Sequence, residues 1–451
     1  MMAIMYRHPD NWRTYQRKIQ RKKRIKKILG RMPFLFVCLG GLFSVMILVA
    51  YVSKHTFVHF SEASYQPNDK LVKPLHPTAD IVDAKKLWPL ISSQFVNYPE
   101  SKSSFSIIRD NTTITIETTI VPELQRYVSH LLEHSITEEA AVIILKPTDG
   151  SVMAMANYKK DGHLQTNLCL DSLFPAASLF KIVSASAAIE KARFTPNRML
   201  TFLGRSHTLY KNQLTNKVNR YSTSISFRKA FAKSVNPIFG KLGMYILKRK
   251  TIRDYAHRFF FDRSIPFDLS LVPSVIRIPE DPYGLAEVTS GFNRSTRISP
   301  LHAALFACAV INGGKVMRPW IIKSITQGPT RIYQAHTGVM GVPIAPKTAR
   351  YLQCMMSDTV HYGTCRKSFW RILRKKPFKK WRIGAKTGTI NDRSDRYKYD
   401  WVTAYAVTGK PLKGMCMSIL EVHGKIMGTR SREIARAIIN YVVSSHLQLG
   451  S

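Results

Sequence analysis

The chain has 451 residues, and 45% of them are hydrophobic, which is an ordinary content for a folded core. Its 68 Lys and Arg residues against 28 Asp and Glu residues give a net charge of +40. Such a charge predicts an anionic partner, which is either nucleic acid or an anionic membrane surface or envelope polymer. The sequence has no zinc-knuckle spacing and no aromatic nucleic-acid motif, so we favour the envelope and expect no nucleic-acid partner.

The N-terminal part of the chain predicts a membrane anchor. Residues 1–32 carry eleven Lys and Arg residues and one acidic residue, Asp10, and residues 33–52 carry no charge. Twenty apolar residues are long enough to cross a bilayer, and the basic flank places the N-terminus in the cytoplasm. A nucleic-acid-binding tail and a cleaved signal peptide are the alternatives. A signal peptide would have a shorter apolar core and an A-x-A-like cleavage site, which is not seen here.

Residues 53–103 are polar with scattered prolines, and we interpret them as an extracytoplasmic linker with a short helix at 84–91. The six cysteines form no C-x-x-C pair. We interpret them as mostly buried small hydrophobic residues, with a disulfide left open.

Residues 104–447 are predicted to fold as one domain of mixed helices and strands. Its strands are indicated by β-branched and apolar runs, and its helices by helical spacing or a proline start. The expected strands are 112–120, 141–146, 151–156, 381–389, 401–408 and 415–422, and the expected helices are 121–135, 178–194, 227–232, 299–311 and 430–445.

The first candidate for chemistry is Ser178, which opens the small-residue helix at 178–194 three residues before Lys181. A serine at a helix start lies near free backbone N–H groups, which help to hold an oxyanion. Lys181 shares its helix face, and a desolvated amine there can accept the proton of the serine. A second S-x-x-K match at Ser226 has the simpler interpretation of a serine that caps an ordinary amphipathic helix.

Two later motifs favour Ser178. They are Ser234-Val235-Asn236 and Lys386-Thr387-Gly388-Thr389, and with Ser178-x-x-Lys181 they form, in this order, the signature of penicillin-binding proteins and class A β-lactamases. From about residue 104 to 445 the chain resembles the transpeptidase domain of monofunctional, class B penicillin-binding proteins. The resemblance includes the hairpin at 141–156, the helix that leads into Ser234 and the helix and turn at 299–314. It implies an α+β fold with an antiparallel five-stranded sheet covered by helices on both faces, here preceded by one transmembrane helix.

The resemblance, together with the chemistry of the side chains, implies a role for each motif residue. Ser178 is the expected nucleophile and Lys181 the base, and the backbone N–H groups of Ser178 and Thr389 form the oxyanion hole. Ser234 and Asn236 relay a proton to the leaving amine and hold the donor amide. Lys386 adds positive charge beside this relay. Thr387 and Thr389 bind the substrate carboxylate, and Gly388 leaves room for the substrate.

The sequence therefore predicts a membrane-anchored peptidoglycan D,D-transpeptidase that acts outside the cytoplasmic membrane and is inhibited by β-lactams. Its partners are stem peptides and proteins of cell-wall synthesis, and no metal or organic cofactor is expected. A D,D-carboxypeptidase or serine β-lactamase of the same fold and a β-lactam sensor or scaffold remain alternatives. Two positions depart from the family: Ala177 stands where a glycine usually precedes the nucleophile, and Gly291-Phe292-Asn293 stands where a glycine-rich turn is usual. The basic segment 366–382 is either a solvated loop or, through its four aromatic residues, a membrane-facing arm.

Overall fold

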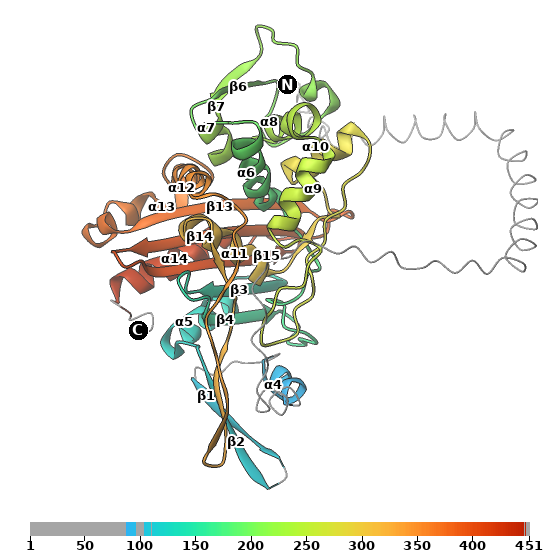
Figure 1. The fold of residues 1–451 in the computed structure, drawn as a ribbon. Coiled ribbons are helices and arrows are strands. Elements are labelled where there is room, and N and C mark those ends of the chain that lie inside the picture. Colours follow the sequence, from blue (N-terminus) through green and yellow to red (C-terminus); the bar gives the residue numbers. More distant parts are fainter. Residues whose placement is uncertain (1–86, 96–102, 110, 446, 448–451) are drawn as a thin grey trace, which may run out of the picture. The chain divides into compact units, whose positions relative to one another are not determined.

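The computed structural model describes residues 87–95, 103–109, 111–445 and 447, which include a five-stranded antiparallel sheet (Figure 1). The sheet confirms the predicted α+β architecture, and its strand order is β13-β14-β15-β3-β4. Its strands are β3 (Glu139–Leu145), β4 (Val152–Lys159), β13 (Arg382–Asn391), β14 (Lys398–Thr408) and β15 (Lys413–His423).

The central strands are apolar on both faces because each face supports its own core. In β3, Ala141, Ile143 and Leu145 belong to one buried cluster, and their neighbours Ala140 and Val142 belong to a second one. A strand covered on both sides is expected to be an almost continuous apolar run rather than an alternating one. This explains why 141–146 stood out in the sequence without a period-2 pattern.

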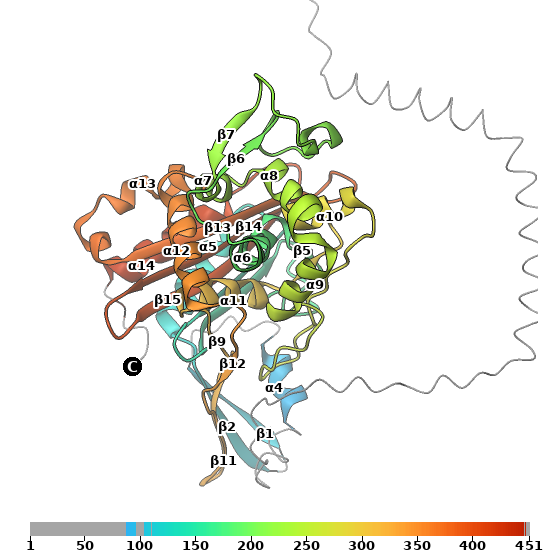
Figure 2. The ribbon, with the colours of Figure 1, turned by 45° about the horizontal axis from the view of Figure 1, so that its top comes forward.

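Helices cover both faces of the sheet, as predicted (Figures 1 and 2). On one face the first cluster includes residues of α6 (Lys181–Lys191), of α11 (Pro300–Ile311) and most of the buried hydrophobic residues of α12 (Pro346–His361). The second cluster packs α5 (Pro122–Glu133), α13 (Arg366–Leu373) and α14 (Ser431–Ser444) on the opposite face. Further elements next to α6 are α7 (Phe227–Ala232), α8 (Asn236–Lys241), the π-helical turn η3 (Leu242–Leu247), α9 (Lys248–Arg258) and α10 (Pro282–Ser290).

A second antiparallel sheet joins segments that are far apart in the sequence. Its order is β1-β2-β10-β11, and its strands are β1 (Ser104–Arg109), β2 (Thr112–Thr118), β10 (Ile322–Gln327) and β11 (Thr330–Gln334). Three short pairs complete the strands: β5 (Phe174–Pro175) with β8 (Arg297–Ile298), β6 (Met199–Phe202) with β7 (Thr223–Ser226), and β9 (Val316–Met317) with β12 (Val339–Gly341).

The short helix expected at 84–91 lies at α4 (Trp88–Gln94) and packs against the domain. Leu87, Ile91 and Phe95 are buried in the first core cluster. The side-chain amide of Asn167 also donates a hydrogen bond of 2.6 Å to the carbonyl of Phe95. The spacing of these three apolar residues sets the helix three to four residues later than predicted. The end of the segment taken as a linker is therefore part of the folded domain.

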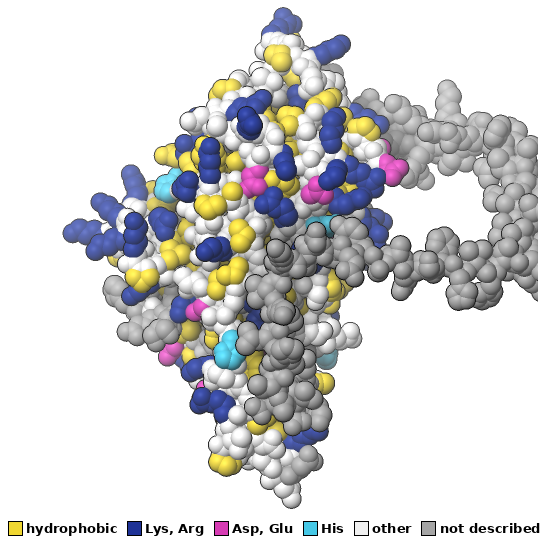
Figure 3. Space-filling view, viewed as in Figure 1, with side chains coloured by type: hydrophobic (Ala, Val, Ile, Leu, Met, Phe, Trp, Pro, Cys, Tyr) yellow, Lys and Arg dark blue, Asp and Glu magenta, His cyan; other side chains and the backbone are white. Residues whose placement is uncertain are grey.

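The basic segment 366–382 is folded, so its interpretation as a solvated loop is wrong, whereas the membrane-facing arm stays a prediction. It folds into α13 and the 3-10 turn η4 (Lys376–Lys380), and Phe369 and Phe378 are buried in the second core cluster. Two of its four aromatic residues therefore anchor the segment to the second core cluster, whereas Trp370 is 44% exposed. Figure 3 shows the Lys and Arg side chains projecting in a group where Figure 1 places α13.

Within the described residues, no helix is long and apolar enough to span a membrane. The predicted tail at 1–32 and the span at 33–52 lie outside the described part of the chain. Of the cysteines that are described, Cys354 is partly buried, and Cys169, Cys308, Cys365 and Cys416 are buried; all five are free thiols. This confirms their interpretation as small hydrophobic residues.

Candidate active site

Ser178 lies on a short helical turn that leads directly into α6. The turn η1 (Ala177–Phe180) is of 3-10 type, and α6 begins at Lys181. The helix expected from 178 to 194 thus has a tighter first turn and ends at Lys191. Ala177 adopts a φ of 47°, a left-handed conformation that favours glycine, which explains why glycine is usual at this position in the family.

Lys181 is fully buried and its Nζ has three oxygen neighbours at the same distance. It lies 2.7 Å from the Ser178 hydroxyl, 2.7 Å from Oδ1 of Asn236 and 2.7 Å from the carbonyl oxygen of Ser290. Burial holds the pKa of Lys181 well below its ordinary value, and the charge of Lys386 lowers it further. The amine is therefore expected to be neutral when the site is ready to react.

A neutral Lys181 fits these contacts in only one way. The oxygens of Asn236 and Ser290 can only accept, so they take the two N–H bonds of the amine, and the lone pair then faces the Ser178 hydroxyl. The orientation of the Asn236 amide is fixed independently, because its Nδ2 donates to the carbonyl of His207 at 3.1 Å. The arrangement positions Lys181 to receive the proton of Ser178.

The loop between α7 and α8 presents Ser234 and Asn236 to the same site. Ser234 adopts a φ of 55°, and Asn236 opens α8 with Pro237 behind it. The Ser234 hydroxyl accepts a hydrogen bond of 2.9 Å from Nζ of Lys386, which also donates to the carbonyl of Thr387 at 2.8 Å. Complete burial lowers the pKa of Lys386 to about 7, so this amine can also change its charge near neutral pH.

Strand β13 brings the third motif against Ser178. A Cβ atom on Gly388 would lie 3.2 Å from the Cβ of Ala177 and 3.3 Å from the backbone nitrogen of Ser178. These distances are tighter than usual contacts, so the close approach of β13 favours glycine here. The hydroxyls of Thr387 and Thr364 lie 2.6 Å apart.

Thr389, at the exposed end of the motif, already has a hydrogen-bond acceptor. Its hydroxyl donates to Oδ1 of Asp400 at 3.0 Å. Asp400 is buried and receives two hydrogen bonds from Arg430, at 2.8 and 2.6 Å, and two from Ser431. Although burial opposes it, the hydrogen bonds and charge of Arg430 lower the pKa of Asp400. An ionised carboxylate only accepts, so Thr389 must rotate before it can donate to a substrate.

The structure brings together the three motifs that stood out in the sequence, and it adds several neighbours that the sequence did not indicate. These are Thr364, the carbonyls of Ser290 and His207, and the Asp400–Arg430 pair. The imidazole of His207 lies close enough to the site for its charges to act on it. Burial lowers the pKa of His207, and the charges of Lys181 and Lys386 lower it further. A backbone carbonyl carries no sequence signal, and no motif distinguishes Thr364. By contrast, Ser226 caps α7 by accepting from the N–H of Lys229 at 3.4 Å, as its simpler interpretation predicted.

A Ser–Lys pair with a buried lysine, a Ser-x-Asn loop and a Lys-Thr-Gly strand around one sheet define the class of serine penicillin-recognising proteins. Residues 140–440 match the family model of the penicillin binding protein transpeptidase domain. The chain belongs to this family.

Curated relatives resemble parts of this chain. Stage V sporulation protein D of Bacillus subtilis is 24% identical over 271 residues, which are 56% of this chain and 40% of that protein. Peptidoglycan D,D-transpeptidase PbpA of Mycobacterium tuberculosis is 25% identical over 255 residues, which are 49% of this chain and 50% of that protein. The chain thus spans about half the length of the curated relatives it matches.

Solved structures share the fold at low sequence identity. Penicillin-binding protein A from M. tuberculosis, as its penicillin G acyl-enzyme complex, superposes with a TM-score of 0.57 at 21% identity, covering 74% of this chain and 80% of that one. The apo form of penicillin-binding protein 3 from the same organism gives 0.59 at 18% identity, with 74% and 80% covered.

Proposed function

We propose that this protein is a peptidoglycan D,D-transpeptidase that crosslinks stem peptides through an acyl-enzyme on Ser178. The observation that carries the proposal is the environment of Lys181, whose Nζ contacts Ser178, Asn236 and Ser290 at 2.7 Å each while completely buried. An amine held in this way is a base directed at one hydroxyl. The family membership and the relative described as a D,D-transpeptidase support the same reaction.

In the first half of the reaction the donor peptide acylates the enzyme. Ser178 Oγ attacks the carbonyl carbon of the penultimate D-alanine, and its proton passes to Lys181. The oxyanion would be held by the backbone N–H groups of Ser178 and Thr389. When the C–N bond breaks, the terminal D-alanine must leave as an amine. Ser234, hydrogen-bonded to Lys386, is placed to pass it a proton. The proton that Lys181 took from Ser178 then restores the Ser234 hydroxyl.

In the second half an amine of a neighbouring stem peptide attacks the acyl carbon. The proton that it loses returns to Ser178 as the ester bond breaks, so the enzyme is regenerated without a net proton change. Thr387 and Thr389 would bind the terminal carboxylate of the donor. Asn236 would bind its backbone amide through Nδ2, and Gly388 leaves the strand open to it.

We also propose the cellular setting predicted from the sequence. Residues 1–32 form a cytoplasmic tail, 33–52 a single transmembrane helix, 53–103 an extracytoplasmic connection and 104–447 the catalytic domain. Within that connection, Leu87, Ile91 and Phe95 of the α4 region pack on the domain core. The catalytic domain then works outside the cytoplasmic membrane, where stem peptides and proteins of cell-wall synthesis are its partners and β-lactams its inhibitors.

The test is a reaction of the purified full-length protein with a D-Ala-D-Ala-terminated stem peptide and an amine acceptor, analysed by mass spectrometry. The proposal predicts a crosslinked product. A product hydrolysed even at high acceptor concentration would indicate a carboxypeptidase, and hydrolysed penicillin without peptide turnover a β-lactamase. A stable penicillin adduct without peptide turnover would indicate a sensor.

Lys181→Arg tests the assigned base, because arginine keeps the charge but is not deprotonated at neutral pH. We expect it to lose both acylation and crosslinking. Lys191→Arg is the matched control, since Lys191 is exposed at the other end of the same helix, and it should behave as the unchanged protein. Acylation of the Lys181→Arg protein at a normal rate would show that another group is the base.

A further inference from the structure

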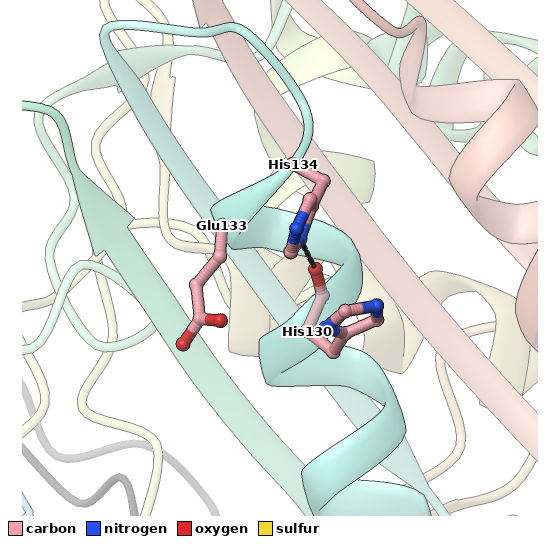
Figure 4. Close-up of side chains that lie close together, drawn as sticks. All are labelled: His130, Glu133 and His134. Carbon is pink, nitrogen blue, oxygen red and sulfur yellow. Dashed lines mark hydrogen bonds between the residues drawn. The ribbon is translucent and has the colours of Figure 1, made fainter.

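The last turn of α5 carries metal-binding side chains that the proposed catalytic reaction does not use. His130, Glu133 and His134 are exposed, and each offers a ligand atom within 4.8 Å of those of the other two. We propose that this turn binds a divalent transition-metal ion, with Zn²⁺ as the expected ion, through both imidazoles and the carboxylate. Figure 4 shows that the three side chains come from the same end of the helix.

The spacing of the three residues suits a metal site on one helix. Residues three and four positions apart lie on the same helix face, and two histidines four apart are the pair by which zinc-binding helices hold the ion. α5 ends at Glu133, and His134 is its C-cap residue. The ring centroids of His130 and His134 are 4.2 Å apart, so both imidazoles already occupy adjacent positions.

A second observation is a hydrogen bond that fixes the tautomer of His134 in a form able to bind a metal. Its Nδ1 lies 2.8 Å from the carbonyl oxygen of His130, the contact drawn as a dashed line in Figure 4. A carbonyl oxygen only accepts, so Nδ1 carries the proton and Nε2 keeps its lone pair. Metal-binding histidines commonly donate their other N–H to a carbonyl in this way, which fixes the tautomer and raises the basicity of the ligand.

The donor set determines which ion fits. Two imidazole nitrogens and one carboxylate oxygen suit Zn²⁺, Cu²⁺ or Ni²⁺, whereas Mg²⁺ and Ca²⁺ prefer oxygen ligands. The Glu133 carboxylate lies within 4.8 Å of a ring nitrogen of each histidine, and because it is exposed it can turn closer to them (Figure 4). Water would complete the coordination.

The charge around the site makes Glu133 important. The residues that line a groove of about 510 Å³ beside the turn include His134, three basic residues and one carboxylate: Lys367, Arg371, Arg436 and Glu433. The excess of positive charge opposes the binding of a cation, so the carboxylate of Glu133 must offset it. The site lies on α5, which packs on the face of the sheet opposite α6. An ion bound there is therefore expected to leave the catalytic reaction unchanged.

The test is a titration of the full-length protein with Zn²⁺ in competition with a chromophoric chelator. We expect one ion per chain with a dissociation constant that is raised at least about tenfold by His130→Ala or His134→Ala, and less by Glu133→Gln. The double variant His130→Ala/His134→Ala should lose the ion. Binding should weaken at acid pH, because histidine binds metals in its neutral form, and excess Mg²⁺ should not compete. His163→Ala, which removes an exposed histidine outside the cluster, is the control and should bind normally.

A second readout separates this site from a loss of folding. Zn²⁺ should raise the melting temperature of the unchanged protein by mass action and leave that of the double variant unaltered, while penicillin acylation stays the same in both. Equal zinc binding by the double variant would overturn the proposal, as would the absence of binding to the unchanged protein at about one hundred micromolar Zn²⁺. Either result would leave the proposed transpeptidase reaction standing.

Discussion

The Thr389 hydroxyl donates a hydrogen bond of 3.0 Å to the buried carboxylate of Asp400 on the neighbouring strand β14. A substrate carboxylate must compete with Asp400 for this hydrogen bond, and Thr389 gains affinity for the substrate only when it turns. Thr387 has no such carboxylate partner among the described residues; its hydroxyl meets that of Thr364. The two threonines of one motif are thus prepared differently for the same ligand.

We predict that Thr389→Val weakens the binding step of penicillin acylation by about tenfold. The lost bond to a charged carboxylate is worth about 1.5–3 kcal/mol, and the bond given up to Asp400 offsets part of it. Thr389→Ser keeps the hydroxyl and should stay close to the unchanged protein. Stopped-flow acylation over a range of penicillin concentrations separates binding from the chemical step. Unchanged binding by the valine variant would mean that Thr389 keeps its hydrogen bond to Asp400. Thr387 would then bind the substrate carboxylate without Thr389.

The buried Lys386 should make stability depend on pH in the alkaline range. Burial lowers its pKa to about 7 in the folded protein, against an ordinary value near 10.4 in the unfolded chain. Between these values the unfolded chain binds more protons, so stability rises with pH, by at most about 1.4 kcal/mol per pH unit. In urea titrations from pH 7 to pH 10, we expect the unfolding free energy of the unchanged protein to rise relative to that of Lys386→Met. Lys367→Met, at an exposed position of α13, is the control. Parallel pH profiles of the unchanged protein and Lys386→Met would show that Lys386 stays charged when buried.

Glu421 on β15 should cost the protein stability at neutral pH. Its side chain is fully buried, and within the described residues neither carboxyl oxygen has a hydrogen-bond partner. Burial raises its pKa well above the ordinary value; the nearby hydroxyls of Thr137 and Ser135 oppose this rise, and the charge of Asp400 adds to it. A group whose pKa is raised on folding gives its full stability below the unfolded pKa and loses it as pH rises toward the folded pKa.

We therefore predict that Glu421→Gln raises the unfolding free energy by roughly 1–3 kcal/mol at pH 7, with the gain shrinking toward pH 4. Urea unfolding at both pH values measures it. Glu280→Gln, whose exposed carboxylate pairs with Arg249, should change stability by less than about 1 kcal/mol. A destabilised Glu421→Gln protein would mean that the carboxylate is ionised and paired.

The two neighbouring aromatic residues of α13 should differ in their effect on stability. Phe369 is completely buried, whereas Trp370 is 44% exposed and lies against Arg371 and Arg374. Phe369→Ala should lower the unfolding free energy by about 3–5 kcal/mol, as for other large core residues, and Trp370→Ala by about 1 kcal/mol or less. Similar small losses of unfolding free energy in both variants would show that Phe369 does not anchor α13 in the core.

The sequence was most informative where chemistry requires particular side chains in a fixed order. Ser178, Lys181, Ser234, Asn236 and Lys386 were all found in this way, and the structure brings them together. The five central strands were also predicted, because strands buried on both faces form distinct apolar runs. The sheet formed by β1, β2, β10 and β11 was not, since nothing local shows that segments about 200 residues apart pair.

The features that the sequence did not reveal depend on packing and pairing with distant parts of the chain. Charge dominates the sequence of 366–382, but two phenylalanines decide where the segment packs. Likewise, the Thr389–Asp400 contact depends on the register of β13 against β14, which aligns Thr389 with Asp400. Register is fixed by the whole sheet and cannot be derived from either strand alone.

The most direct measurement is mass spectrometry of the protein after reaction with penicillin, with the modified peptide located by fragmentation. The account predicts one adduct per chain, on Ser178, that disappears in Ser178→Ala and persists in Ser226→Ala. An adduct that survives in Ser178→Ala, or one located on Ser226, would contradict it.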